Sequence, residues 1–267
     1  MAINTGSFAK ALWPGVNSWY GQAYDEHGVE YTDLFNTESS RKAYEEDMGT
    51  SMFGLAAVKP EGGQITYDTA QQGFLTRYTH VTYGLGFIIT REMVDDDLYD
   101  IIGKKRAQGL AFSMRQTKEI IAANVYNNAF DSTYSGGDGK ELLATDHPTI
   151  MGAAFANENT AATLSEASLE DLSIDIMQAK NDRGLNISLI PDCLIINPEL
   201  VYEADRILNS PLRVGTANND LNALRNMGKF PGGVKVNHYL TDTNAYFIRT
   251  NCPDGMKHFE RRSDDFT

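Results

Sequence analysis

The chain has 267 residues, of which 42% are hydrophobic and 22% charged, enough for one large domain or two small ones. A formal net charge of −13 excludes a surface built to grip nucleic acid, because neutralising phosphates requires clustered Lys and Arg. Two cysteines, Cys193 and Cys252, exclude a disulfide framework, and no apolar stretch approaches the roughly 18 residues of a membrane span. The first residues lack a signal peptide's apolar core, which predicts synthesis in the cytosol.

Residues 1 to about 50 predict an extended arm with short helical pieces. Six aromatic residues are spread through this weakly periodic segment: Trp13, Trp19, Tyr20, Tyr24, Tyr31 and Phe35. Aromatic side chains on an arm without its own core need another surface to pack against. That surface is either the rest of this subunit or a neighbouring subunit, and the sequence leaves both alternatives open.

Residues 51–90 predict a long β-hairpin. The first strand holds Ile65 and Tyr67, residues 68–73 form the polar connection, and the second strand runs from about Arg77 to Ile89. Period-two alternation continues for more than ten residues of the second strand, whereas strands average roughly 5–6 residues. One face holds the larger apolar side chains: Thr79, Val81, Tyr83, Leu85, Phe87 and Ile89.

The opposite face of this predicted strand is small, because it carries Gly84 and Gly86 beside His80 and Thr82. Glycines permit the backbone of another segment to approach closely. A projecting arm that docks on a neighbour accounts for both the apolar face and the glycines. A hairpin folded back on its own core accounts only for the apolar face.

An amphipathic helix is predicted from Arg91 to about Asn127. Its apolar residues recur mostly at spacings that keep one helical face: Val94, Leu98, Ile101, Ile102, Leu110, Met114, Ile121 and Val125. At 1.5 Å per residue it would be roughly 50 Å long. The alternative is an ordinary helix broken at Gly103 or Gly109, since an interior glycine costs about 1 kcal/mol.

The remaining segments alternate between loops and elements. Flexible loops are expected at 131–140 and 152–163, and a helix opens near Ser165, with Ser168 and Asp171 as an approximate capping box, and ends at Gly184. A buried strand at 189–196 holds Cys193, and Pro198 starts another helix. A polar loop at 210–233 precedes two strands between 234 and 250, around a turn at 242–244. The final stretch, residues 256–267, is predicted to be a strand without a partner.

No sequence motif strongly indicates a catalytic, phosphate-binding or metal-binding site. SGGDGK at 135–140 fails as a phosphate loop, because Tyr134 replaces the required glycine and Glu141 the magnesium-binding hydroxyl. Acids at the start of the long helix, Asp95, Asp96, Asp97 and Asp100, point to different sides and complement the helix dipole. Neither the scattered histidines nor Asp146-His147 form a catalytic arrangement. We therefore predict no catalytic residue, no cofactor-binding residue and no metal ligand.

The residues themselves resemble the major head subunit, or major capsid protein, of Mu-like bacteriophages and prophages. The resemblance runs over nearly the whole chain, and no single motif is diagnostic; their order and number make it specific. These motifs are NTGSFAKALWPGVNSWYG (4–21), YEED (44–47), FGLAAVKPEGGQITYD (53–68), QGFLTRYTHVTYGLGFIITREMVDDDLY (72–99), HP (147–148), LSEASLE (164–170), GTANNDLNAL (215–224) and PDGMKHFERR (253–262).

The resemblance implies an α+β protein with the HK-ninety-seven-like capsid fold. On this reading the chain divides into an N-terminal arm (1–52), an extended loop or β-hairpin that lies on the adjacent subunit (53–90), a peripheral domain with a spine helix (91–163), an axial domain (164–250) and a return to the peripheral domain (251–267). The family normally continues with a further C-terminal segment, so truncation after residue 267 is expected.

The implied function is structural. Copies of the chain are expected to form pentamers and hexamers that close into an icosahedral head around double-stranded DNA, without sequence-specific DNA binding and without a membrane. A scaffold, a maturation protease, a portal and decoration proteins are the expected partners, and the host bacterial cytoplasm is the expected place of assembly. We found no residue pair that predicts covalent cross-linking.

The residues predicted to contact a neighbouring subunit combine the hairpin and the arm: Arg77, Tyr83, Gly84, Leu85, Gly86, Phe87, Trp13 and Trp19. Two other functions compete with this interpretation. An encapsulin-like compartment would use the same fold and enclose enzyme cargo instead of DNA. A soluble cytosolic enzyme with an α+β core would need a pocket with convergent polar groups, and the sequence indicates none.

Overall fold

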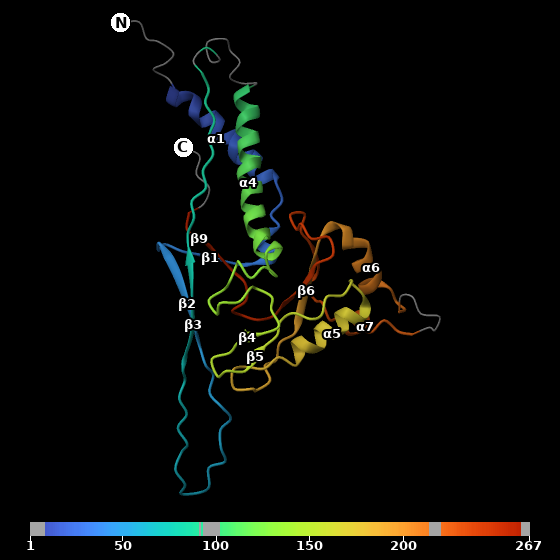
Figure 1. Cartoon of the computed structure of the whole chain (residues 1–267). Helices are drawn as coiled ribbons and strands as arrows, with labels where there is room; N and C mark the ends of the chain where they lie inside the picture. The colour runs from blue at the N-terminus through green and yellow to red at the C-terminus, as the bar shows by residue number, and fades with distance from the viewer. Residues whose placement is uncertain (1–8, 91, 93–101, 214–219, 263–267) are drawn as a thin grey trace.

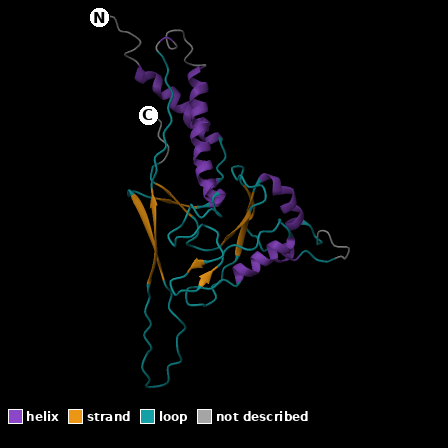
Figure 2. Ribbon diagram, viewed as in Figure 1, coloured by secondary structure: helices purple, strands orange, loops and turns teal. Residues whose placement is uncertain are grey.

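The structure, a computed structural model, describes residues 9–90, 92, 102–213 and 220–262, with only the backbone for residues 9–16. Three clusters of buried side chains organise it. Two parts extend away from the central cluster: a pair of helices on one side and a thin loop on the other (Figures 1 and 2).

A three-stranded sheet lies at the centre of the buried core. In spatial order its strands are β7 (Gly233–Val236), β6 (Pro191–Ile196) and β8 (Tyr246–Thr250). β7 runs parallel to β6, and β8 runs antiparallel to it. The predicted strand at 189–196 is therefore confirmed with a later start. The two strands predicted at 234–250 are also confirmed, and they flank β6 rather than each other.

Alternate side chains of β6 enter different cores, as the period of a strand requires. Cys193 and Ile195 pack with aromatic residues near the end of the long helix. Leu194 and Ile196 pack on the opposite face, against the helices that cover it. Both faces of β6 are covered, which explains why the strand is a continuous apolar run instead of an alternating one.

The covering helices are α5 (Glu166–Met177), the 3-10 turn η3 (Pro198–Leu200), α6 (Val201–Asn209) and α7 (Ala223–Met227). Pro198 starts its helix as predicted, whereas α7 lies in a region predicted as loop. Asn222 caps the start of α7, and Gly228 ends it with a φ of 58°. A five-residue helix is too short to leave a periodic apolar signal, so only these caps could have indicated it.

The predicted start of α5 near Ser165 is confirmed, whereas its predicted capping box and its predicted end are wrong. The capping box is formed by Ser165 and Ser168, one turn earlier than the Ser168–Asp171 pair. The helix ends at Met177 and not at Gly184. Asn181 Oδ1 accepts the backbone N–H groups of the residues two and four positions later, and this side chain holds a separate tight turn that ends the helical path.

The long helix is α4 (Lys104–Asn127), which ends at the predicted residue and runs through Gly109 without a break. A short π-type turn at residues 102–103 precedes it. Apart from Glu92, the predicted part before residue 102, including Val94, Leu98 and Ile101, lies outside the described residues. The acids Asp95, Asp96, Asp97 and Asp100 lie outside them too.

The N-terminal arm contains an 18-residue helix, α1 (Ala9–Glu26), which corrects the prediction of an extended arm with short helical pieces. Tyr20 and Ala23 of α1 are buried against Leu110 and Ala111 of α4, and the two helices form the upper part of Figure 1. α1 is stabilised by packing on α4, and the weak periodicity of its own sequence did not indicate it.

After α1 the arm continues through α2 (Tyr31–Leu34) into β1 (Asn36–Ser39), which pairs in parallel with β9 (Lys257–Glu260). The prediction that the last strand lacks a partner is therefore wrong. Tyr31 and Phe35 are buried within this chain. For these two residues and Tyr20, the structure selects the alternative in which arm aromatics pack on their own subunit.

The remaining strands form two small hairpins. β2 (Tyr44–Thr50) pairs antiparallel with β3 (Gln72–Thr79), and β4 (His147–Pro148) pairs with β5 (Ala154–Phe155). The predicted hairpin at 51–90 therefore exists with different strands. Ile65 and Tyr67 lie in the connecting loop, and the predicted strand from Arg77 to Ile89 ends at Thr79.

Candidate assembly surface

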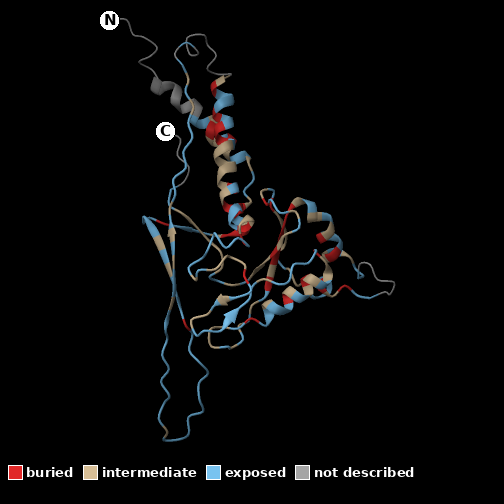
Figure 3. Ribbon diagram, in the orientation of Figure 1, coloured by how far each residue is buried: buried red, intermediate tan, exposed pale blue. Residues whose placement is uncertain are grey.

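The segment between β2 and β3 extends far from every buried cluster. We call residues 52–70 the projecting loop; it forms the long blue-to-teal excursion at the bottom of Figure 1 and is exposed along almost all of its length in Figure 3. Val58 is 97% exposed and Tyr67 is 91% exposed. The large apolar side chains that the loop presents to solvent are Met52, Phe53, Leu55, Val58, Ile65 and Tyr67.

This exposure carries a free-energy cost. Burying one such side chain is worth about 1.5–3 kcal/mol, so covering the loop would contribute on the order of 10 kcal/mol to association before the entropic costs. Contiguous exposed apolar surface on a folded chain marks an interaction site. The projecting loop therefore has the composition of an interface and not of a solvated surface turn.

The tip of the projecting loop is a turn at residues 60–63. The Gly63 N–H donates to the Pro60 carbonyl at 3.0 Å, and Gly62 has a φ of 76°, a conformation that favours glycine. The sequence PEGG is a strong turn signal. Recognising it would have placed the reversal here instead of at 68–73, and would have found the loop.

The base of the projecting loop is held by Ser51 and Gln71. The Ser51 N–H donates to the Gln71 carbonyl at 2.9 Å, and the Gln71 N–H donates to Ser51 Oγ at 2.8 Å. Just above, Asp68 accepts the N–H groups of Gly54 and Thr69, both at 2.8 Å. These two backbone donors hold the pKa of Asp68 below its usual range, with a further contribution from Arg183.

The stem of the hairpin holds Arg77, one of the predicted contact residues. Its Nε and Nη2 donate to Glu46 Oε1 at 2.8 and 2.6 Å, and its guanidinium lies 4.4 Å from the centre of the Tyr44 ring. Both partners lie on β2, across the ladder. Arg77 is therefore already engaged in fastening the stem within its own chain.

Residues 80–90 carry the other predicted contacts and make no strand pairing. Tyr83 and Leu85 are exposed, while Phe87 is half-buried against the cluster that joins α1 and α4. A Cβ added at Gly84 or at Gly86 would meet no atom within 4 Å. Within the subunit neither glycine is required by packing.

The structure brings only part of the predicted contact set together. Phe87 and the half-buried Trp19 both lie at the helix pair, because α1 supplies Trp19 and the α1–α4 cluster receives Phe87. Arg77 lies apart from them on the stem. Trp13 belongs to α1, and its side chain is outside those described.

The hairpin rests on the loop at 131–157 through two close approaches. A Cβ at Gly137 would collide with Thr76 of β3, and one at Gly73 would lie 2.6 Å from Ile150 Cδ1. Only glycine fits either position without displacing its neighbours. The direction of the stem therefore depends on the shape of this supporting loop.

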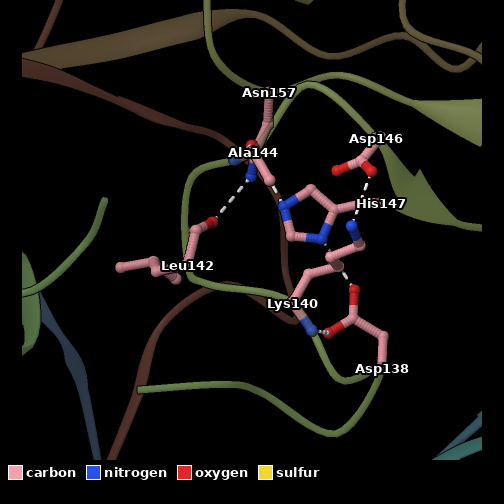
Figure 4. Close-up of polar contacts among 7 residues, drawn as sticks. All are labelled: Asp138, Lys140, Leu142, Ala144, Asp146, His147 and Asn157. Carbon is pink, nitrogen blue, oxygen red and sulfur yellow. Dashed lines mark hydrogen bonds and ion pairs between the residues drawn. The ribbon is translucent and has the colours of Figure 1, made fainter. Parts of the chain in front are cut away.

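A polar network fixes the supporting loop (Figure 4). His147 Nδ1 lies 2.6 Å from Asp138 Oδ2, and its Nε2 lies 3.2 Å from Asn157 Oδ1. Asn157 Oδ1 also accepts the Ala144 N–H, and its amide nitrogen donates to the Leu142 carbonyl, which sets the orientation of the amide. Both ring nitrogens thus lie against side-chain oxygens, which fixes the orientation of the ring.

Electrostatics reinforce this network. Burial raises the pKa of Asp138, but the hydrogen bonds from His147 and from the Lys140 backbone outweigh it and lower the pKa below its usual value. Lys140 Nζ lies 2.5 Å from Asp146 Oδ2. The predicted flexible turn at 131–140 is thus tied to β4, and the Asp146-His147 pair has a structural role here.

Two hollows of the described surface lack either the volume or the depth of a typical small-molecule site. One of about 20 Å³ is lined by Tyr126, Phe130, Leu240 and Phe247 among others, and a shallow one of about 500 Å³ lies over polar residues at the ends of β1 and β9. Small-molecule sites are typically enclosed, mostly apolar and about 300–1,000 Å³. Burial raises the pKa of the Cys193 thiol, which makes it a poor nucleophile.

The described ranges contain neither a cluster of metal-ligating side chains nor a membrane-spanning helix. No three His, Cys, Asp or Glu residues among them come close enough together to hold a metal ion. In the same part of the chain, no helix combines the length and apolar character required to cross a bilayer.

A family comparison decides the class of protein. The family model described as phage capsid protein matches residues 74–265, which is most of the chain. The chain belongs to the phage capsid protein family. None of the curated proteins matches the sequence significantly.

Solved phage capsid structures share the fold. The chain is similar to the procapsid of bacteriophage JBD30, with a TM-score of 0.57 and 13% identity over 88% of this chain and 99% of that chain. It is also similar to the capsid of the same phage, with a TM-score of 0.62 and 12% identity over 80% of this chain and 92% of that one. A third similar structure, the JBD30 capsid decorated with minor capsid protein trimers, gives a TM-score of 0.58 and 14% identity over the same shares of both chains.

Family membership and fold together indicate a structural role in the capsid of a phage virion. The mixture of helices and small sheets agrees with the predicted α+β class.

Proposed function

We propose that this chain is the major capsid protein of a Mu-like tailed phage or prophage, and that its copies form pentamers and hexamers that close into an icosahedral shell with the HK-ninety-seven-like fold. The observation that carries the proposal is the projecting loop, with its row of exposed apolar side chains. A free subunit leaves these side chains in water, and a neighbouring copy would cover them. Assembly then gains the hydrophobic free energy that the isolated fold forgoes.

The neighbour contact would extend from the projecting loop to residues 80–90. Tyr83 and Leu85 supply exposed apolar surface there, and Gly84 and Gly86 leave room for the backbone of a second copy. Arg77 would contact the neighbour only through the surface that its pairing with Glu46 leaves open. Trp13 and Trp19 of α1 complete the proposed set.

The proposed domains follow the capsid resemblance. The arm would comprise residues 1–52, the extended loop 53–90, the peripheral domain with the spine helix 91–163, the axial domain 164–250 and the return segment 251–267. In support, the sheet of β6 and its covering helices share one buried cluster that lies within 164–250. α4 lies in the proposed peripheral domain and is packed by α1 of the arm.

The shell would enclose double-stranded DNA, and the net charge of −13 suits a container that must not bind its genome tightly. A scaffold, a maturation protease, a portal and decoration proteins would act with this chain during assembly in the host cytoplasm. Decoration has a precedent in the fold, because the similar JBD30 capsid is decorated with minor capsid protein trimers.

Electron microscopy of the expressed chain tests the proposal. The high-mass fraction from expression, alone and together with the neighbouring genes of its prophage, is examined by negative staining. We expect closed shells, tubes or isolated hexamer rings. Only small uniform particles under both conditions would contradict the proposal, and shells filled with enzyme instead of DNA would favour the encapsulin-like alternative.

A further inference from the structure

Arg183 lies outside the projecting loop but binds both of its legs. Its Nε donates to the Met52 carbonyl at 3.1 Å, and its Nη2 donates to the Thr69 carbonyl at 2.8 Å. Nη2 also lies 3.3 Å from Asp68 Oδ1. One guanidinium therefore joins the outgoing and the returning leg at the point where the loop leaves the folded subunit.

The backbone beneath Arg183 is held in a tight turn between α5 and β6. Asn181 Oδ1 accepts the N–H groups of Arg183 at 3.0 Å and Leu185 at 2.9 Å, and Gly184 has a φ of 76°. An isolated bridge between Lys180 and Asn186 closes the turn. The arginine side chain, 21% exposed, is thus presented from a fixed platform and not from a mobile surface.

Few other contacts fix the direction of the projecting loop. Paired strands end at Thr50 and Gln72, and no backbone ladder continues between the two legs within residues 52–70. Beyond the Ser51–Gln71 pair, the legs are joined by Asp68 and Arg183. Asp68 binds a backbone N–H of each leg, and Arg183 binds a carbonyl of each leg.

We propose that Arg183 is the positioning residue that sets the direction in which the projecting loop leaves its own subunit, and thereby the angle at which neighbouring copies meet. This inference rests on the proposed function, in which the loop docks on a neighbour. A guanidinium suits the task because its planar fork directs several donors at once, whereas a lysine ammonium is a single point of charge. The contact couples the region of β6 to a loop more than a hundred residues earlier in the chain.

The test compares R183A and R183K with the wild type and with R206A. Arg206 is a matched control, because it is an exposed arginine on α6 whose ion pair is with Glu203 of the same helix. Hydrogen exchange in the unassembled subunit reports the clamp. We expect the amides of Gly54 and Thr69 to exchange about tenfold faster in R183A, with R183K between R183A and the wild type and R206A unchanged.

Shell geometry is the second readout, since a merely stabilising contact would not move it. We expect R183A and R183K to give a broad range of shell diameters or open sheets, while R206A gives the uniform wild-type shells. Wild-type exchange rates in R183A would overturn the inference, and so would uniform wild-type shells formed by R183A despite faster exchange. R183K keeps the test decisive if R183A fails to fold, because it retains the charge and the aliphatic stem.

The two readouts separate this inference from the proposed function. Exchange is measured before assembly, so unchanged rates in R183A refute the role of Arg183 whatever the wild type assembles into. Absence of any wild-type assembly refutes the proposed function instead, even where the exchange rates identify Arg183 as the clamp.

Discussion

β6 and the projecting loop are both rich in apolar residues, and the structure treats them in opposite ways. Leu194 and Ile196 of β6 have no exposed surface, whereas Val58 and Tyr67 of the loop are almost fully exposed. Successive side chains of β6 pack into two different buried clusters of the same chain, whereas the side chains of the loop pack into neither. The contrast separates two groups of hydrophobic residues: those of β6 stabilise the subunit, and those of the loop are proposed to join it to another subunit.

The largest expected effect on the stability of the subunit is in β6. We expect L194A to lower the free energy of unfolding by about 2–5 kcal/mol, because it removes a fully buried side chain and leaves a cavity. Chemical denaturation of the unassembled subunit measures this loss. V58A is the matched control in the loop and should lie within about 0.5 kcal/mol of the wild type. Equal losses in the two variants would refute the distinction.

Glu119 tests whether a buried polar group also stabilises the fold of the subunit. Its carboxylate is buried and accepts the N–H groups of Glu30 and Tyr31, at 3.2 and 2.8 Å, at the start of α2. Burial raises its pKa, which the two backbone donors only partly offset. E119A leaves both donors unpaired and should cost about 2–3 kcal/mol in thermal or chemical unfolding.

The isosteric E119Q provides the control for this site. Its amide oxygen can still accept one of the two N–H groups, so it should lose clearly less stability than E119A. A loss as large as that of E119A would mean that the negative charge, and not the hydrogen bonding, holds α2 in place.

His258 on β9 predicts a smaller effect that depends on pH. Burial, together with the nearby Lys118, lowers the pKa of His258 below its usual 6.5. The folded chain therefore binds this proton less readily than the unfolded chain, so the contribution to stability is present above pH 6.5 and is lost as the pH falls towards the folded pKa. Its Nε2 is buried without a hydrogen-bond partner among the described residues, and its ring packs on Tyr31.

H258F keeps the ring and removes the titration. We expect stability at neutral pH to be retained and the decline between about pH 7 and 5 to become shallower than in the wild type. Unfolding midpoints measured across that range check this. An identical pH dependence in both proteins would show that His258 is not the group responsible.

V58D together with Y67D tests the assembly side. Both positions are almost fully exposed in the subunit, so the double variant should change its unfolding free energy by no more than about 0.5 kcal/mol. Assembly should nevertheless fail, because the contact would then have to bury two carboxylates. Size-exclusion chromatography and electron microscopy report assembly; normal shells from this variant would contradict the proposed docking.

At Gly84 and Gly86 we expect substitution to have the smallest effect on the stability of the subunit. A Cβ added at either position meets no atom within 4 Å, so we expect G84W and G86W to fold with wild-type stability. Because a second backbone is proposed to approach here, assembly should be blocked more strongly than in G84A or G86A. Normal shells from the tryptophan variants would remove residues 84–86 from the proposed contact.

Sequence reasoning succeeded where apolar residues meet their partner inside the same chain. The run before Asn197 gave β6, Pro198 marked the start of the next helix, and the periodicity of α4 placed its end at Asn127. These elements carry their own signal, because burial on their own core imposes the pattern.

Sequence reasoning failed for elements whose packing partner lies far along the chain or is proposed to lie in another subunit. The alternating pattern from Arg77 to Ile89 predicted one long strand. β3 nevertheless ends at Thr79, because residues 80–90 pair with no strand among the described residues. α1 depends on α4 for its cover, and β9 on β1. The contact of Arg183 with the projecting loop joins segments more than a hundred residues apart, and no local pattern could indicate it.

The most direct test of the central claim measures whether the projecting loop is covered on assembly. V58C is introduced in a C252S background, where the remaining Cys193 is buried, and thiol labelling rates are compared between free subunits and assembled shells. We expect rapid labelling of the free subunit and at least about tenfold protection in shells. Equal labelling rates in the two states would show that no neighbour covers the loop and would contradict the account.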